Sequence, residues 1–215
     1  MSPTDSSADR GTPAGLDDQR WGPHRGRAPV PPEGFVEMVD ELRVLLDRVT
    51  AAAPPADLVA EMTKTFTELS ARLEPYEVGE REQLTGHLSA YPGRAQTMSP
   101  QLFVTERDTV HAAGHVTYGR YFLGGNGAVH GGAIPLLFDE IMGRLSNTGG
   151  RKPARTAYLH VDFRSITPIE KQLRIEARIV SEEGRKRLIR GTLEDGDTLC
   201  AEAEGLFVAL NPGQP

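Results

Sequence analysis

Stretches of alternating apolar and polar residues follow one amphipathic helix in the second half of the chain, and this order constrains the fold more than any other feature. Apolar residues recur at every second position over 159–163 and 173–179, which is the period of a strand with one buried face. Gly184 and Asp195-Gly196 mark tight turns, so we expect hairpins to join the strands after the helix. An antiparallel sheet with a helix over roughly 132–146 packed on it follows, which is an α+β fold.

The chain ahead of this sheet is expected to contain a tail and a helical extension. Six prolines and four glycines crowd residues 1–33, which hold too little apolar surface to offset the entropy of ordering them, so this segment is predicted to be a disordered tail. Residues 34–99 contain two apolar runs at helical spacing, separated by Pro54-Pro55, and are predicted to form a helical hairpin and a surface linker. The strand-rich domain is assigned to 100–211, and 212–215 form a short tail.

Charge and cysteine content exclude several classes of protein. The net charge of −6 at pH 7 argues against a dedicated nucleic-acid-binding protein. Cys200 is the only cysteine, so neither an intrachain disulfide nor a cysteine-rich zinc site can form, and we expect a protein of the reducing cytoplasm. No apolar run approaches the roughly 18 residues that a membrane span needs. Neither a metal nor a redox cofactor is expected.

A glycine-rich loop leads into the predicted helix and is the first candidate site. The loop, Gly124 to Gly132, lacks the lysine of a phosphate-binding P-loop and the third glycine of a dinucleotide fingerprint. Gly131 and Gly132 stand where the first N–H groups of a helix have no intrahelical partner. Because neither residue has a Cβ, a carbonyl oxygen that becomes negative in a transition state can approach these donors closely. The alternative is that the glycines serve only a tight turn.

Two adjacent carboxylates, Asp139 and Glu140, compete for a catalytic role on the helix. Asp139 shares one side of the helix with Gly132 and Gly143, and aspartate is unfavourable inside a helix, which favours a functional reason for it. Glu140 points about 100° away, and helical spacing does not choose between the two. Gly131 and Asp139 are about 12 Å apart along the helix axis. If both act on one carbonyl, they come from different subunits of a dimer with shared sites.

These residues form a motif, Gly127-x-x-His130-Gly131-Gly132 followed by Leu137-x-Asp139, that resembles the hotdog-fold acyl-CoA thioesterase superfamily. The closest resemblance is to its PaaI-type and thioesterase-superfamily-member branches. Further blocks that agree are Arg155-Thr156-Ala157-x-Leu159, Phe163-Arg164, Glu183-Gly184-Arg185-Lys186 and Ala203 to Val208. The resemblance covers residues 100–211. It implies an antiparallel sheet wrapped around a long central helix, a homodimer or a dimer of dimers, and hydrolysis of acyl-CoA to free acid and CoA.

The resemblance also implies roles for individual residues. Asp139 would be the nucleophile or the general base that activates water, and the backbone N–H of Gly131 would bind the thioester oxygen. Thr156 would help to place the water or the carboxylate from the facing strand. His130 would shape the loop, with direct proton transfer as the alternative, and Gly132 would contact the substrate.

The chain departs from the family pattern at one position of the glycine loop. Many relatives carry an asparagine six residues before the motif histidine, where this chain has Gly124. Asn126 is nearby but out of register, so the resemblance assigns it no role.

Basic residues are concentrated in the segment 144–190, which supports a site for a polyanionic ligand such as coenzyme A. The segment contains 12 of the 24 lysines and arginines but only five acidic residues. Arg185 and Lys186, in a hairpin of the matched region, are the predicted phosphate contacts together with Arg155. Three other functions stay open: hydration of acyl-CoA by the same fold, non-catalytic binding of acyl-CoA, and a purely structural dimer.

Overall fold

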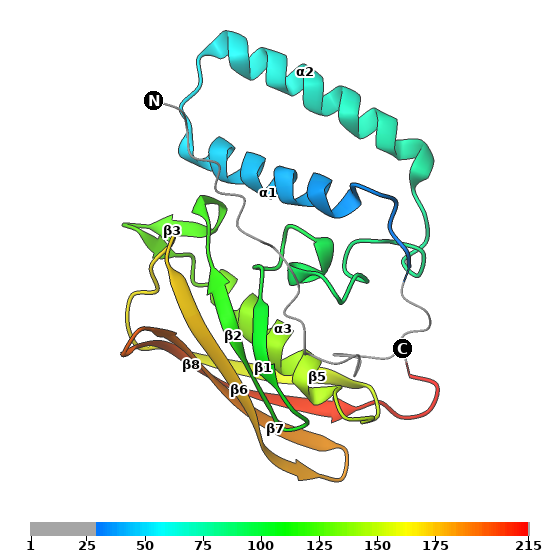
Figure 1. The fold of residues 1–215 in the computed structure, drawn as a ribbon, viewed down its shortest axis with the longest axis vertical. Coiled ribbons are helices and arrows are strands. Elements are labelled where there is room, and N and C mark those ends of the chain that lie inside the picture. The colour runs from blue at the N-terminus through cyan, green and yellow to red at the C-terminus, as the bar shows by residue number, and fades with distance from the viewer. Residues whose placement is uncertain (1–28, 215) are drawn as a thin grey trace.

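A curved antiparallel sheet wraps around one helix, and two further helices lie to one side of it (Figure 1). The computed structural model describes residues 29–214. The predicted tail at 1–33 therefore falls almost entirely outside the described residues. The expected α+β hotdog fold, with an N-terminal helical extension, is confirmed.

Six strands form the main sheet in the order β1-β2-β6-β7-β8-β5, and every neighbouring pair is antiparallel. A ribbon of two short strands, β3 and β4, stands apart from it. The two predicted hairpin turns are present, and Gly184 and Gly196 adopt φ values of +59° and +58° there, a left-handed conformation that favours glycine. The strands are β1 Phe103–Arg107, β2 His111–Thr117, β3 Leu123–Gly125, β4 Ala128–Val129, β5 Ala154–Phe163, β6 Gln172–Glu183, β7 Lys186–Asp195 and β8 Thr198–Ala209.

The central helix, α3 (Ala133–Ser146), begins within one residue of its predicted start and ends at its predicted end. Its apolar residues recur at helical spacing and pack against the inner face of the sheet, where Ile175, Ile189 and Leu193 are fully buried. Burial of each such side chain contributes about 1.5–3 kcal/mol to folding. The helix is thereby fixed in rotation, which decides which of its residues can reach solvent.

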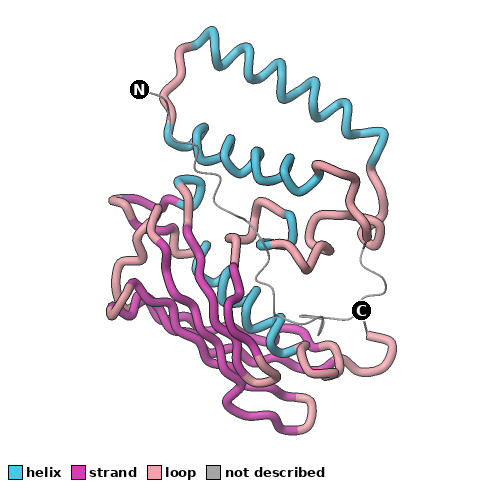
Figure 2. The backbone as a smooth tube through the Cα atoms, viewed as in Figure 1, coloured by secondary structure: helices cyan, strands magenta, loops and turns pink. Residues whose placement is uncertain are grey.

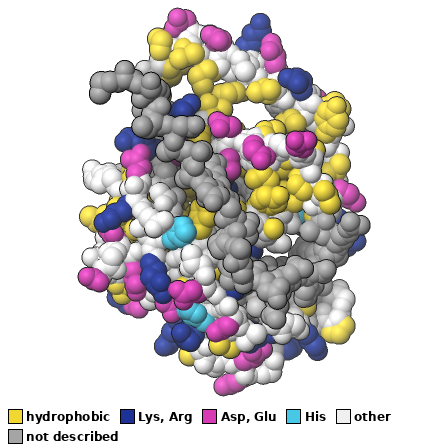
Figure 3. Space-filling model, viewed as in Figure 1, with side chains coloured by type: hydrophobic (Ala, Val, Ile, Leu, Met, Phe, Trp, Pro, Cys, Tyr) yellow, Lys and Arg dark blue, Asp and Glu magenta, His cyan; other side chains and the backbone are white. Residues whose placement is uncertain are grey.

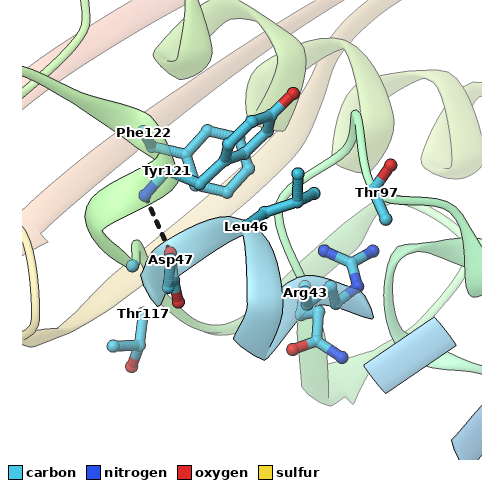
Figure 4. Close-up of a pocket in the computed structure, with 9 residues that line it drawn as sticks. Arg43, Leu46, Asp47, Thr97, Thr117, Tyr121 and Phe122 are labelled. Carbon is cyan, nitrogen blue, oxygen red and sulfur yellow. Dashed lines mark hydrogen bonds between the residues drawn. The ribbon is translucent and has the colours of Figure 1, made fainter. Parts of the chain in front are cut away.

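The helical extension comprises α1 (Phe35–Ala51) and α2 (Ala56–Leu73), joined by a turn that contains Pro54-Pro55. Helix α1 docks on a short 3-10 turn that precedes β3, where Asp47 Oδ1 accepts the backbone N–H of Tyr121 at 2.7 Å (Figure 4). A cavity of about 70 Å³, lined by Arg43 and Asp47 among others, remains beneath α1. No helix of residues 29–214 is long and apolar enough to cross a membrane.

Helix α2 differs from α1 in that none of its residues is buried. The apolar stripe of α2, which includes Phe66, Leu69 and Leu73, faces solvent, and apolar side chains gather over the two helices in the upper half of Figure 3. The apolar stripe of α1 is covered only in part, since Val39 is buried but Leu42 and Val49 are exposed. Within the described residues nothing buries the stripe of α2.

The segment between α2 and β1 is more than the surface linker that its turn-rich sequence predicts. It runs back across the strand-rich domain (Figure 2), and Leu88, Ala95 and Ser99 within it are buried. Arg94 and Ala95 both adopt φ of +52°, an uncommon conformation for residues with a side chain. The segment thus has a fixed path, and its side chains reach α3.

Candidate active site

Asp139 is the single exposed residue of α3. Its Oδ1 accepts a hydrogen bond of 2.7 Å from the Thr156 hydroxyl of β5. A carboxylate that faces solvent from an otherwise covered helix, and is oriented by a neighbouring hydroxyl, is able to accept a proton from a water molecule. The structure thus brings together Asp139 and Thr156, two of the residues predicted for the site.

Glu140, the competing carboxylate, is buried in an ion-pair cluster. Its two oxygens lie 2.8 Å from Arg94 Nη2 and 3.3 Å from Arg144 Nη1, and its side chain is 5% exposed. Burial lowers the pKa of Arg144 to about 10, an effect that the nearby Glu140 partly offsets. Arg144 also donates to the carbonyl oxygen of Ser89 at 2.7 Å. Glu140 therefore ties the segment ahead of β1 to α3, and Asp139 alone is accessible for chemistry.

The two glycines before α3 differ in the state of their N–H groups. The Gly132 N–H donates to Nδ1 of His130 at 3.0 Å, and the Ala133 N–H donates to the His130 carbonyl at 2.8 Å. The Gly131 N–H has no hydrogen-bond partner within residues 29–214. Gly131 is therefore the available donor, and His130 accepts a loop hydrogen bond through Nδ1. Because the N–H of Gly132 already donates to His130, the predicted substrate contact of Gly132 depends on the space left by the absent side chain.

The geometry of the glycine loop explains the departure from the family pattern. A Cβ at Gly124 would lie 2.8 Å from the Cα of His130, so this conformation leaves no room for an asparagine side chain there. Asn126 and Gly127 have φ of 50° and 76° and make the tight turn between β3 and β4. Asn126 thus shapes the turn at the tip of the loop.

Gly131 and Asp139 are separated along the direction of the α3 axis within one subunit. Asp139 lies six residues after Ala133, the first residue of α3, which is a helical rise of about 9 Å, and Gly131 precedes the helix. Thr156 lies on β5, the edge strand of the sheet, where residues 155–158 are exposed. An exposed edge strand offers unpaired backbone groups to another strand. One subunit thus carries both chemical groups, but does not bring them to a single carbonyl.

The basic residues of the segment 144–190 form two sets, those with an ion pair and those without one. Eight of the twelve form ion pairs with acidic residues, among them Arg151 with Glu182 and Arg190 with Glu204. The other four form no ion pair with any described residue and are exposed; we call them the basic patch, and they are Lys152, Arg155, Arg185 and Lys186. Arg185 donates only to the Asn211 side-chain oxygen.

The sheet register gathers the basic patch at one end of β5, β8 and β7. Val208 of β8 pairs with Arg155 on one side and with Lys186 on the other. The neighbouring row contains Thr156 and the buried Arg187, which donates to the carbonyl of Ser146 on α3. Because side chains alternate along a strand, Arg155 and Lys186 point away from α3. These two residues therefore do not contact Asp139 within the subunit.

Of the remaining strand histidines, His115 stacks on Phe103 with 5.1 Å between the ring centroids, and the other two lie beside carboxylates. His111 Nε2 lies 2.9 Å from Glu176, and His160 Nε2 lies 3.3 Å from Asp162. Nowhere in residues 29–214 do three or more His, Cys, Asp or Glu side chains come together in a group that could hold a metal ion.

Two residues near the site were missed by sequence reasoning. Phe163 lies against Gly131: a Cβ added there would be 3.7 Å from the Phe163 ring. The alternation along β5, which places Phe163 on the same face as Leu159, was a signal that could have found it. Arg94, which binds Glu140, comes from a turn-rich segment with no pattern to indicate the pairing.

Comparison with known proteins finds similarity in the strand-rich domain. Residues 126–202 match the model of the thioesterase superfamily. Acyl-coenzyme A thioesterase THEM4 of Mus musculus is 32% identical over 99 residues, which are 45% of this chain and 42% of the relative. The same protein of Bos taurus is 35% identical over 96 residues, 44% of this chain and 39% of the relative. The chain thus matches less than half the length of these curated relatives.

A solved structure extends the comparison to the helices. The crystal structure of the thioesterase superfamily protein RHA08564 has a TM-score of 0.71 and 23% identity, and covers 84% of this chain and 97% of its own. Residues 100–211 are 112 of 215 residues, or about 52% of the chain. The likeness therefore includes much of the segment ahead of β1, so the helical extension is a shared part of that fold.

Proposed function

We propose that the chain, whose residues 126–202 match the model of the thioesterase superfamily, is a member of that superfamily and hydrolyses acyl-CoA thioesters to the free acid and CoA. One observation carries the proposal: Asp139 is the only exposed residue of α3 and is held at 2.7 Å by Thr156. A carboxylate in this setting suits a general base, because it is open to water and its orientation is fixed by the Thr156 hydroxyl.

In the proposed reaction, Asp139 accepts a proton from a water molecule while the water oxygen attacks the thioester carbonyl carbon. The carbonyl oxygen becomes an oxyanion and accepts a hydrogen bond from the Gly131 N–H. The tetrahedral intermediate collapses as the carbon–sulfur bond breaks, and the proton passes from Asp139 to the sulfur of CoA. In the alternative mechanism, Asp139 attacks the carbonyl carbon, the carbon–sulfur bond breaks and CoA leaves as the thiolate. Water then hydrolyses the acyl-enzyme anhydride to the free acid and Asp139, and the proton released passes to the CoA thiolate.

We propose a homodimer in which Asp139 of one subunit works with the partner subunit's Gly131, and pairs of dimers are a possible higher assembly. The separation of the two groups supports a shared site, because Asp139 stands about 9 Å along α3 from Ala133 and Gly131 precedes that helix, so one thioester group cannot span it. The exposed edge strand β5 supplies a surface for antiparallel pairing with a second copy, as closed two-fold dimers require. The single cysteine, Cys200, is buried, in keeping with the cytoplasm as the proposed compartment.

The basic patch is the proposed contact for the phosphates of coenzyme A. Its members Lys152, Arg155, Arg185 and Lys186 are the basic residues of 144–190 that no acidic residue of the described chain neutralises. A phosphate group can replace solvent at such side chains without breaking an existing ion pair. The long pantetheine arm of coenzyme A separates its phosphates from the thioester, so patch and Asp139 need not be adjacent.

Removal of the patch charges is expected to weaken binding rather than chemistry. The double substitution of Arg185 and Lys186 by alanine should raise KM for acyl-CoA about tenfold and leave kcat within about twofold, because these contacts are the same in ground and transition states. Hydrolysis of the matching N-acetylcysteamine thioester, which lacks the phosphates, should not change. Arg178→Gln is the control, since Arg178 is an exposed arginine of the same sheet outside the patch. An equal loss on both substrates would contradict the assignment.

Product analysis tests the proposed reaction against the alternatives. The purified chain is incubated with short-chain, long-chain and aryl acyl-CoAs and with a 2-enoyl-CoA, and the products are identified by mass spectrometry. We expect free acid and free CoA. A hydrated enoyl-CoA with its thioester intact would instead indicate a hydratase, and saturable binding of every acyl-CoA without any product would indicate a binding protein.

A further inference from the structure

We infer that Phe163 forms the apolar wall that binds the acyl group beside the oxyanion donor, and so determines acyl selectivity. The inference rests on the proposed function and deepens it, because it names the part of the substrate that this surface recognises. Phe163 is 56% exposed, although it ends a strand of the core sheet. A Cβ added to Gly131 would lie 3.7 and 3.9 Å from two carbons of its ring, so the ring stands in van der Waals range of that position.

The exposed position of Phe163 is imposed by a fixed backbone. The N–H groups of Arg164 and Ser165 both donate to the carbonyl of Cys200, at 2.8 and 3.0 Å, so the chain turns sharply after Phe163. Phe163 itself pairs with Ala201 across the sheet. Because the backbone is fixed, the ring stays in solvent, and exposure of a large apolar ring to water is unfavourable unless an apolar group covers it.

The turn that carries Phe163 is joined to the glycine loop. The Val129 N–H donates to the carbonyl of Thr167 at 2.8 Å, and the Ile169 N–H donates to that of Gly127 at 3.1 Å. Phe163 and Gly131 are therefore held in one hydrogen-bonded unit. A thioester whose carbonyl oxygen is bound to the Gly131 N–H lies beside this ring. Of the two groups on its carbonyl carbon, the acyl chain and the sulfur of CoA, the apolar acyl chain gains from contact with the ring.

Acyl selectivity is the readout that separates this role from a structural one. Phe163→Ala should raise KM about tenfold for hexanoyl-CoA and benzoyl-CoA but less than twofold for acetyl-CoA, with kcat changed little, because loss of an apolar contact scales with the apolar group bound. Phe163→Leu, which keeps an apolar side chain, should restore much of the loss. The control is Tyr76→Ala, an exposed aromatic in the turn after α2, outside the strand-rich domain.

Two results would overturn the inference. One is an equal change in KM for all three substrates. The other is dissociation of the assembly of the Phe163→Ala variant in size-exclusion chromatography, which would make the ring a subunit contact. Failure of the proposed function is distinguishable, because the wild-type chain would then release no CoA in the same assay.

Discussion

Glu140→Gln is expected to destabilise the protein by about 3 kcal/mol, because it removes a buried carboxylate that pairs with both Arg94 and Arg144. Arg144 is 9% exposed and keeps its charge after the substitution, so a buried cation loses its ion pair with Glu140. For a chain of this length, the midpoint of thermal unfolding should fall by about 6–12 °C. Differential scanning calorimetry or circular dichroism at pH 7 measures the change.

A matched substitution exists on α2. Lys64 and Glu68 form an ion pair with the same four-residue spacing as Glu140 and Arg144, but their side chains are 79% and 63% exposed. Glu68→Gln should therefore change stability by less than about 0.5 kcal/mol. The folded Glu140→Gln variant should still hydrolyse acyl-CoA, since Glu140 does not reach solvent. Equal stability of the two variants would mean that the cluster around Glu140 does not hold the segment ahead of β1.

Asp139→Asn is expected to have the opposite effect, a loss of turnover without a loss of stability. Asparagine keeps the shape of the side chain and can still accept the hydrogen bond from Thr156, but it cannot take a proton from water. We expect kcat to fall by about 10²–10⁴-fold, as for other positioned general bases. Because Asp139 is exposed, the midpoint of unfolding should stay within about 2 °C of the wild type.

The control for Asp139→Asn is Asp197→Asn, which changes an exposed aspartate in the turn between β7 and β8. It should leave kcat and stability unchanged. Binding of coenzyme A to the Asp139→Asn variant, measured by calorimetry, should match the wild type, since the carboxylate acts on the thioester carbonyl. A variant that turns over as fast as the wild type would remove Asp139 from the mechanism.

The sequence predicts the fold well where local patterns are strong. Helical spacing places α3 within one residue, and the turn glycines at 184 and 196 place the hairpins, because both signals depend on backbone geometry at neighbouring positions. The resemblance adds the hotdog architecture. Helical spacing could not decide which of Asp139 and Glu140 is accessible. The burial of Glu140 depends on its ion pair with Arg94, a residue 46 positions earlier in the chain.

Other parts of the site depend on tertiary contacts that no local pattern reports. The twelve basic residues of 144–190 look alike in sequence, and only the folded structure shows that eight of them form ion pairs. Likewise, the two glycines before α3 appear equivalent until His130 is seen to accept the N–H of Gly132. The exposed apolar stripe of α2 has the spacing of a packed helix, and within the described residues nothing covers it.

The most direct test of the central claim is the activity of a heterodimer built from two inactive variants. One subunit carries Asp139→Asn and the other carries Gly131→Asp, which places a negative charge where the oxyanion would form; different affinity tags allow the mixed dimer to be purified. In a shared site, the intact Asp139 of one subunit meets the partner's intact Gly131, so one of the two sites works and about half of the wild-type kcat per dimer returns. A mixed dimer as inactive as either variant alone, beside an active wild type, would contradict a site shared between subunits.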